Sequence, residues 1–449
     1  MTSVFHSKKV LTPEGIKEAY IFIVDGKITD VKDTYTGDFS MRIEDFGDKV
    51  IMPGIIDTHV HINEPGRTEW EGFITATKSA AAGGITTLID MPLNSSPTTI
   101  NKSSFEEKLL VAKNKLYVNV GFYGGLVHGN ADKLEELVKG GVTGIKAFMI
   151  DSGIDEFPFA REEDLREAMS VLSNYNIPLL VHAELESPAK LDKNLDPSSF
   201  SSFLKNRPAE WETDAIRMLI MLCKVFTCHV HIVHVSSGDS IELIRKAKND
   251  GLNITAETCP HYLFFSAEDI PDKDTRFKCT PPIRDKENQN MLWKGLNEGV
   301  LDMIVSDHSP CDPELKEMES CNFEKAWGGI SGLQFSLPVV WTEAKKRGIS
   351  LEKISELMSV NPAKLAGLDE IKGKIAKGFD ADFVIFSPEK TFTVIENIIQ
   401  HKHKITPYTG TEFYGLVEAT LLNGVRVFDG GSFSAEKTGK ELLRNNIKI

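Results

Sequence analysis

Cysteine is scarce in this chain, and the few cysteines are thinly spread. There are six of them in 449 residues, and none forms a Cys-x-x-Cys pair. Thiolate zinc sites and the disulfide frameworks of small secreted domains both need clustered cysteines. We therefore expect reduced thiols that pack as small buried hydrophobic side chains.

Long apolar runs and blocks of like charge are also missing. No 18 apolar residues run uninterrupted, as a membrane span requires, and the start MTSVFHSKKVLTPEG lacks the apolar stretch of a signal peptide. The formal net charge is -14, which repels a phosphate backbone or an anionic membrane surface. The sequence thus predicts a cytoplasmic protein that binds neither nucleic acid nor membrane.

The composition is that of a globular protein, and the chain shows two distinct patterns of apolar and polar residues. The chain is 41% hydrophobic and 26% charged, which suffices for one large core and a smaller unit. Residues 1–50 and 371–449 alternate apolar and polar positions with turn glycines, which predicts one small β-sandwich built from both chain ends. Between them, residues 51–370 alternate apolar runs with helical segments.

Eight apolar runs precede about residue 310, and this rhythm predicts an α/β fold of the (β/α)8 TIM-barrel type. The runs are IMPGIIDTHVHI, ITTLIDMP, LYVNVGFYGGL, VTGIKAFMI, IPLLVHAE, CHVHIVHVSS, LNITAETCPHY and LDMIVSDHSP. Active sites of such barrels lie at the carboxyl ends of the strands. The residues at those ends are therefore the first candidates for function.

Metal-binding residue types gather at the predicted strand ends. The i, i+2 spacing of His59 and His61 directs both imidazoles to one face of the first strand. Each candidate alone has a plain alternative, because a histidine at a strand end is often structural and an aspartate often caps the next segment. The candidates, on five strands, are His59, His61, Lys146, His182, His234 and Asp307.

Lys146 is the hardest of these residues to explain as structural. It lies in the apolar run GIKAFMI, where an unpaired ammonium would cost several kcal/mol or lose its proton. One alternative is a side chain that extends to the barrel mouth and reaches water. The other is a neutral amine that captures carbon dioxide as a carbamate, which removes the buried cation and supplies two oxygens to bridge metal ions.

Taken together, four imidazoles, one bridging anion and one carboxylate would satisfy two divalent ions and leave room for a shared water. Nitrogen and oxygen ligands without thiolates favour Zn²⁺, with Mn²⁺ or Co²⁺ as alternatives. Two ions that share a water lower its pKa and supply hydroxide at neutral pH. The sequence therefore predicts a binuclear hydrolytic centre.

An ordered set of motifs extends over essentially the whole chain. They are PGIIDTHVHINEPGRTEWEG, GGITTLIDMPLNS, GIKAFM, VHAE, HVSS, ETCPHY, KCTPPIRD, VSDHSPC and KAWGGISGLQ. In this order they resemble the cyclic-amidohydrolase branch of the amidohydrolase superfamily, which contains dihydroorotases, hydantoinases and allantoinases. The resemblance implies that His59 and His61 bind one metal, His182 and His234 the other, Lys146 is the carboxylated bridge, and Asp307 is both ligand and acid/base.

Finer residues separate the members of this branch. Dihydroorotases usually have an Arg two residues after the second metal-binding His, which grips a substrate carboxylate, whereas this chain has Asn63. Hydantoinases typically have a Tyr five residues beyond the bridging Lys, where this chain has Asp151, and they lack EPGRTEWEG. The pattern is most similar to allantoinases, which implies hydrolytic opening of allantoin to allantoate in purine and ureide catabolism by a hydroxide shared between the metals.

Two other functions stay open at this point. One is a hydantoinase or dihydropyrimidinase type of enzyme that acts on other cyclic ureides. The other is a non-catalytic assembly protein on the same fold, which the six filled ligand positions disfavour. The resemblance also implies a small-molecule cyclic ureide as substrate and a homo-oligomer, with a tetramer as the expected state.

Substrate contacts are expected from the loops KCTPPIRD and GGISGLQ, which in relatives hold the ring amide. This makes Thr280 and Ser331 the substrate-binding candidates, with ordinary loop or cap chemistry as the alternative. Asn94 and Arg67 are weaker candidates near other strand ends, and Arg67 has the alternative of bracing its own loop. Three further histidines could support the ligands from behind: His229, His231 and His261.

Overall fold

Eight parallel strands form the larger part of the computed structural model, which describes residues 2–35, 43–186, 192 and 194–444. All eight come from the eight apolar runs, and β8 and β9 together make the third strand. A parallel bridge between Val60 and His308 joins the first strand to the segment after the last. The predicted barrel is confirmed. Its strands are β6 (Ile55–Val60), β7 (Ile85–Asp90), β8 (Asn119–Phe122), β9 (Gly124–Leu126), β10 (Ile145–Phe148), β11 (Leu179–His182), β12 (Val230–Ile232), β13 (Ile254–Thr258) and β14 (Met303–Ile304).

Helices cover the outside of the barrel, and several of them bury one apolar stripe. In α4, Leu165, Ala168, Met169 and Leu172 recur at helical spacing and are buried. Polar caps fix helix starts, as where the Asp285 side chain accepts the Asn288 amide of α9 at 2.9 Å. The helices are α1 (Phe73–Ala82), α2 (Lys102–Ala112), α3 (Leu134–Gly140), α4 (Glu162–Leu172), α5 (Phe200–Lys205), α6 (Ala209–Cys223), α7 (Ser240–Asn249), α8 (Pro260–Phe264), α9 (Lys286–Asn297), α10 (Ser336–Lys346), α11 (Leu351–Ser355) and α12 (Asn361–Ala366).

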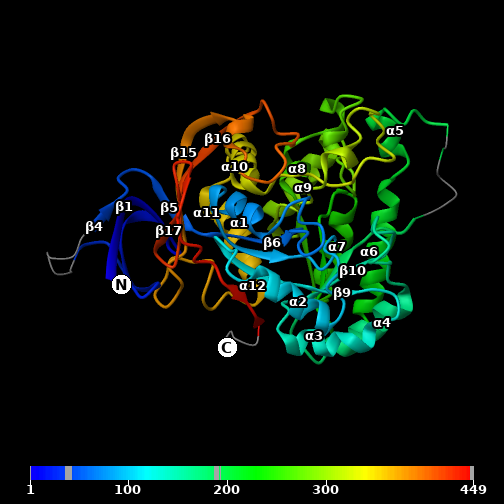
Figure 1. Ribbon diagram of the computed structural model, residues 1–449, viewed down its shortest axis with the longest axis horizontal. Coiled ribbons are helices and arrows are strands. Elements are labelled where there is room, and N and C mark those ends of the chain that lie inside the picture. The colour runs from blue at the N-terminus through cyan, green and yellow to red at the C-terminus, as the bar shows by residue number, and fades with distance from the viewer. Residues whose placement is uncertain (1, 36–42, 187–191, 193, 445–449) are drawn as a thin grey trace.

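A separate nine-stranded sheet combines the two ends of the chain, as the sequence predicted (Figure 1). Its order is β18-β17-β16-β15-β5-β1-β2-β3, and β4 pairs with β1. β5 joins the two halves, since it pairs parallel with β1 and antiparallel with β15. The strands are β1 (Thr2–Thr12), β2 (Gly15–Val24), β3 (Lys27–Lys32), β4 (Ile43–Asp45), β5 (Val50–Pro53), β15 (Phe383–Thr393), β16 (Glu412–Leu422), β17 (Val425–Asp429) and β18 (Ser432–Phe433).

The end of the described chain returns from this sheet to the barrel. β19 (Glu441–Leu442) pairs parallel with β8, at the edge of β8 opposite β7. This return could not be predicted from the sequence, because a two-residue strand has no periodicity of its own. The domain boundaries near residues 50 and 370 stay a prediction.

Across the described ranges, no helix is both long enough and apolar enough to cross a bilayer. All six cysteines are free thiols, and all but Cys321 are buried. This agrees with the expectation that they pack as small hydrophobic side chains.

Candidate active site

Five of the six predicted metal ligands line one small cavity at the carboxyl ends of the barrel strands. The cavity has a volume of about 40 Å³. Lys146 lies just beneath it in β10, fully buried, with its ammonium 4.9 Å from the centroid of Phe148, which lines the cavity. The five lining ligands are His59, His61, His182, His234 and Asp307.

The side chains of the candidate ligands lie close together. Asp307 Oδ1 lies 3.2 Å from His59 Nε2 and 3.5 Å from His61 Nε2. The rings of His182 and His234 lie 4.5 Å apart between centroids. Ligand atoms of His59, His234 and Asp307 all lie within 4.8 Å of one another. The two pairs of imidazoles therefore face a common space beside one carboxylate.

The backbone turns sharply at two of these residues. His234 and Asp307 have φ values of 39° and 45°, in the left-handed region that non-glycine residues seldom adopt. Both follow the end of a short strand, β12 and β14 respectively. Such conformations cost on the order of 1–3 kcal/mol and cluster at functional sites. The turns bring both side chains to the cavity, whose lining includes them.

Several buried polar atoms at this cavity lack a hydrogen-bond partner within the described part of the chain. They are His59 Nε2, His234 Nδ1 and Lys146 Nζ. A buried polar atom without a partner costs about 1–3 kcal/mol, so three of them in one place indicate that something else binds there. Burial lowers the pKa of each of the four imidazoles and lowers the pKa of Lys146 to about 7. Neutral imidazole is the form that binds metal ions, so this donor set fits divalent cations.

Two buried carboxylates hold the imidazoles from behind. Glu257 accepts a hydrogen bond from His59 Nδ1 at 2.5 Å and another from His231 Nε2 at 2.9 Å. His59 Nδ1 is then the protonated nitrogen, which leaves the Nε2 lone pair free to bind a metal. His231, one of the three histidines suggested as support for the ligands, thus contacts Glu257, the carboxylate that holds His59.

Glu184 holds the imidazole of His182 in the same way. Its Oε2 accepts from His182 Nε2 at 2.6 Å, and Arg207 binds the carboxylate in a bidentate pair at 2.8 and 2.6 Å. Burial alone would raise the pKa of Glu184, but Arg207 and His182 lower that pKa to about 2. The carboxylate therefore stays ionised and accepts from Nε2, which leaves the Nδ1 lone pair of His182 free to bind a metal.

Residues 50–427 match the sequence model of the amidohydrolase family. The chain belongs to this family. It is 46% identical to an allantoinase from Arabidopsis thaliana over 96% of this chain and 89% of that one. It is 45% identical to an allantoinase from Streptomyces avermitilis over 98% of each chain. Among solved structures, the L-hydantoinase (dihydropyrimidinase) from Arthrobacter aurescens matches with a TM-score of 0.92 and 30% identity over 99% of this chain and 100% of that one.

As an amidohydrolase, the chain is a metal-dependent hydrolase, and its ligand groups agree with a divalent metal site. Sequence reasoning missed Glu257 and Glu184, although both lie in the motifs ETCPHY and VHAE. A carboxylate that follows a predicted ligand by two residues, as Glu184 follows His182, was an available signal for such a partner. For Glu257 the sequence holds no such signal, because it lies 198 residues from His59.

Replacing Glu257 with Gln is expected to weaken metal binding by about 10- to 100-fold, because the amide holds His59 less firmly and makes its ring less basic. Metal affinity is measured by titration of a chelator against the folded protein. The matched control is Glu242→Gln, since the Glu242 side chain is 81% exposed on α7. Equal affinities in the two variants would contradict a supporting role for Glu257.

The other candidates of this amidohydrolase occupy different places. Thr280 lines the small cavity, whereas Ser331 is half-buried and does not belong to its lining. Asn94 Nδ2 lies 3.2 Å from His61 Nδ1, so Asn94 contacts a predicted ligand. Arg67 pairs with Glu156 at 2.9 Å, which agrees with the bracing alternative. Substrate binding by Thr280 and Ser331 stays a prediction.

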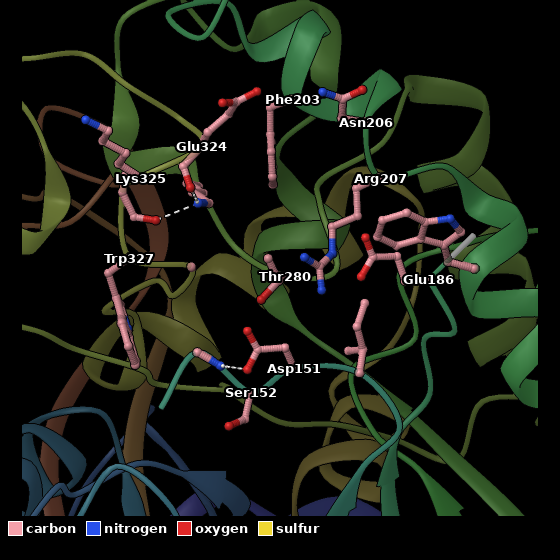
Figure 2. A pocket seen from close by; sticks show the side chains of 16 residues that line it. Asp151, Ser152, Glu186, Phe203, Asn206, Arg207, Thr280, Glu324, Lys325 and Trp327 are labelled. Carbon is pink, nitrogen blue, oxygen red and sulfur yellow. Dashed lines mark hydrogen bonds between the residues drawn. The ribbon is translucent and has the colours of Figure 1, made fainter. Parts of the chain in front are cut away.

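A wider polar cavity of about 740 Å³ lies outside the small one (Figure 2). Asp151, Glu186, Asn206 and Arg207 belong to its lining. The two cavities share four lining residues, so the narrow metal-ligand site opens directly into the wide one. The shared residues are Ser152, Thr280, Trp327 and Gly328.

Proposed function

We propose that this chain is an allantoinase, which opens the ring of allantoin by hydrolysis and releases allantoate. The observation that carries the proposal is the convergence of six ligand-type side chains from five strand ends on one site. The choice of allantoin rests on 45–46% identity to proteins named allantoinase over nearly the full chain. The narrow cavity for a ring amide and the wide polar cavity for a ureido arm support the same substrate.

Two divalent ions are proposed to bind at the six residues, most favourably Zn²⁺ because the donors are nitrogen and oxygen. His59 and His61 would hold one ion, and His182 and His234 the other. Asp307 would complete the first site, and a carbamate on Lys146 would join both. When bound, such ions lower the pKa of water and polarise a carbonyl oxygen. The carbamate is supported by the buried Nζ of Lys146, which has no hydrogen-bond partner among the described residues.

Asp307 is the proposed acid/base of the reaction. Burial alone would raise its pKa, but the neighbouring His59 and His61 hold the pKa of Asp307 well below its usual value. The carboxylate is therefore ionised before the reaction and accepts the proton released when water adds to the ring carbonyl. It then passes this proton to the departing ring nitrogen, so one side chain serves both transfers.

Two positions support a neutral, polar substrate over the alternatives. Asn63 is buried, and its Nδ2 donates to the Pro310 carbonyl at 3.0 Å, so it offers no cation to a substrate carboxylate. Asp151 is exposed at the wide cavity, and its Oδ1 accepts the Gly153 amide at 3.1 Å. An acceptor at this place suits the N–H groups of a ureido arm.

The alternative is a hydantoinase-type enzyme, because solved hydantoinases share this fold. Allantoin, hydantoin and dihydrouracil are compared as substrates of the metal-loaded protein. We expect kcat/KM for allantoin to be higher by about 10² or more, since a site built to bind polar groups rejects analogues that lack them. Equal or faster turnover of hydantoin or dihydrouracil would favour the alternative.

The resemblance to the family further supports a homo-oligomer, and we propose a tetramer that acts in the cytoplasm on a small cyclic ureide. Light scattering of the purified protein measures the number of chains. Metal analysis of the same sample separates the enzyme from a non-catalytic assembly protein, because only the enzyme needs bound ions.

A further inference from the structure

The passage between the two cavities has one side built from two separate loops. Thr280 comes from the segment after α8, and Trp327 and Gly328 come from the loop before α10. The two loops touch closely, since a Cβ placed on Gly328 would lie 3.0 Å from Thr280 Oγ1. The width of the passage therefore depends on how firmly these loops are held together.

Lys278 fastens one loop to the other. Its Nζ donates to the main-chain carbonyls of Glu324 at 3.0 Å and Ala326 at 2.6 Å. A third side of the ammonium faces the ring of Phe203, 5.4 Å from its centroid. Figure 2 shows Phe203 and Glu324 at this end of the wide cavity. Lys278 lies two residues before Thr280, so any shift of this contact moves the passage.

Lys316 makes a second fastening deeper in the protein. Its Nζ donates to the carbonyls of Lys278 at 3.2 Å and Trp327 at 3.1 Å, and also to that of Gly329. These three bonds use all three hydrogens of the ammonium. Since they reach residues on both sides of the contact, Lys316 ties the Lys278 backbone to the loop that carries Trp327.

The acceptors for both lysines are main-chain carbonyls, which is a costly way to bury an ammonium. Burial lowers the pKa of Lys278 to about 7 and also lowers that of Lys316. A neutral amine keeps two hydrogens, which suffice for the two carbonyl contacts of Lys278, whereas the three carbonyl contacts of Lys316 need the protonated form. Apolar side chains of similar size would cost less free energy to bury. The two lysines are therefore better explained by the position in which they hold the two loops.

We propose that Lys278 and Lys316 are positioning residues that hold the Glu324–Gly329 loop against the Thr280 segment and so set the width of the passage to the metal-ligand cavity. The kinetic part of this inference rests on the proposed function, because it is followed with allantoin. The structural part does not, because Trp327 reports on the passage by its fluorescence. A loosened passage would bind the ring less precisely, and a misplacement of about 1 Å can cost up to about 10²-fold in rate.

The test compares Lys278→Met, Lys316→Met and Lys278→Arg with Lys294→Met. Lys294 is 71% exposed on α9 and lines neither cavity, so its variant removes one charge and leaves the contacts of Lys278 and Lys316 in place. The methionine variants at 278 and 316 are expected to lower kcat/KM about 10- to 100-fold, mainly through KM, at unchanged metal content. Lys278→Arg should recover most of this loss, and Lys294→Met should stay within about twofold of the wild type.

Acrylamide quenching of Trp327 gives a readout that needs no turnover. Each protein is measured with and without Trp327→Phe, and the difference isolates this side chain. Quenching of Trp327 should rise about twofold or more in Lys278→Met, as expected for local opening. Unchanged KM and unchanged quenching would overturn the proposal, even if the thermal unfolding temperature fell. If Lys278→Met does not fold, Lys278→Gln, which keeps a donor on a shorter side chain, is held to the same criteria. If the wild type fails to consume allantoin, the quenching result still decides the positioning role.

Discussion

Asp307→Asn is expected to lower kcat by about 10² to 10⁴ while the metal content stays near that of the wild type. The amide has the size of the carboxylate and can still contact the imidazoles, but it can neither accept a proton from the attacking water nor deliver one to the ring nitrogen. The side chain of Asp307 is 10% exposed, and its Oδ1 lies 3.2 Å from His59 Nε2, so the carboxylate lies next to a proposed metal ligand. Steady-state turnover of allantoin and metal analysis of the same sample measure both quantities.

Asp250→Asn is the matched control for this substitution. Asp250 is exposed just after α7 and far along the chain from every proposed ligand, so its variant should behave as the wild type. A rate near normal for Asp307→Asn with both ions bound would assign the proton transfers to some other group. A loss of metal as large as the loss of rate would show that Asp307 acts as ligand alone.

Lys146→Ala is expected to lower metal affinity and activity by at least about 10²-fold. Loss of a group that only hydrogen-bonds a ligand costs about 10- to 100-fold in metal affinity, and loss of a bridging ligand should cost more. Lys146 is fully buried, and its amine has no hydrogen-bond partner in the described part of the chain. Alanine leaves a space in which a short carboxylic acid can take the place of the carbamate. Metal content and turnover are measured with and without added acetate or propionate.

Lys146→Met is the control, because its side chain fills most of the same space and leaves no room for an added acid. Both variants should lose metal, and only the alanine variant should partly recover with acid. Full metal content in Lys146→Ala without any acid would contradict the bridging role. Recovery in both variants would show that the acid acts elsewhere.

The barrel and the place of the candidate ligands within it could be predicted because their signals are local. Eight apolar runs gave eight strands, and the carboxyl ends of parallel strands meet at one end of a barrel whatever the loops do. His59 and His61 share a strand face by spacing alone. Lys146 was expected in a buried strand, and it is fully buried there.

The groups behind the ligands could not be predicted in the same way. The partner of His59 is Glu257. The partner of His182 is Glu184, which is held by Arg207, 23 residues further along the chain. Such contacts depend on how strands and loops pack, which periodicity does not encode. The same is true of Lys278, whose carbonyl partners lie 46 and 48 residues further along the chain. Arg67 is the opposite case. Its place near a strand end made it a candidate for substrate binding, but its side chain forms an ion pair with Glu156.

The proposed metal centre is tested most directly by the consumption of allantoin by metal-depleted protein during titration with Zn²⁺ in the presence of bicarbonate. We expect no turnover without metal, a rise that levels off at about two ions per chain as a binuclear site requires, and a lower plateau when bicarbonate is withheld. Full activity in the metal-depleted protein, or a plateau reached with no ion retained by the chain, would contradict the claim that these six side chains form a metal centre.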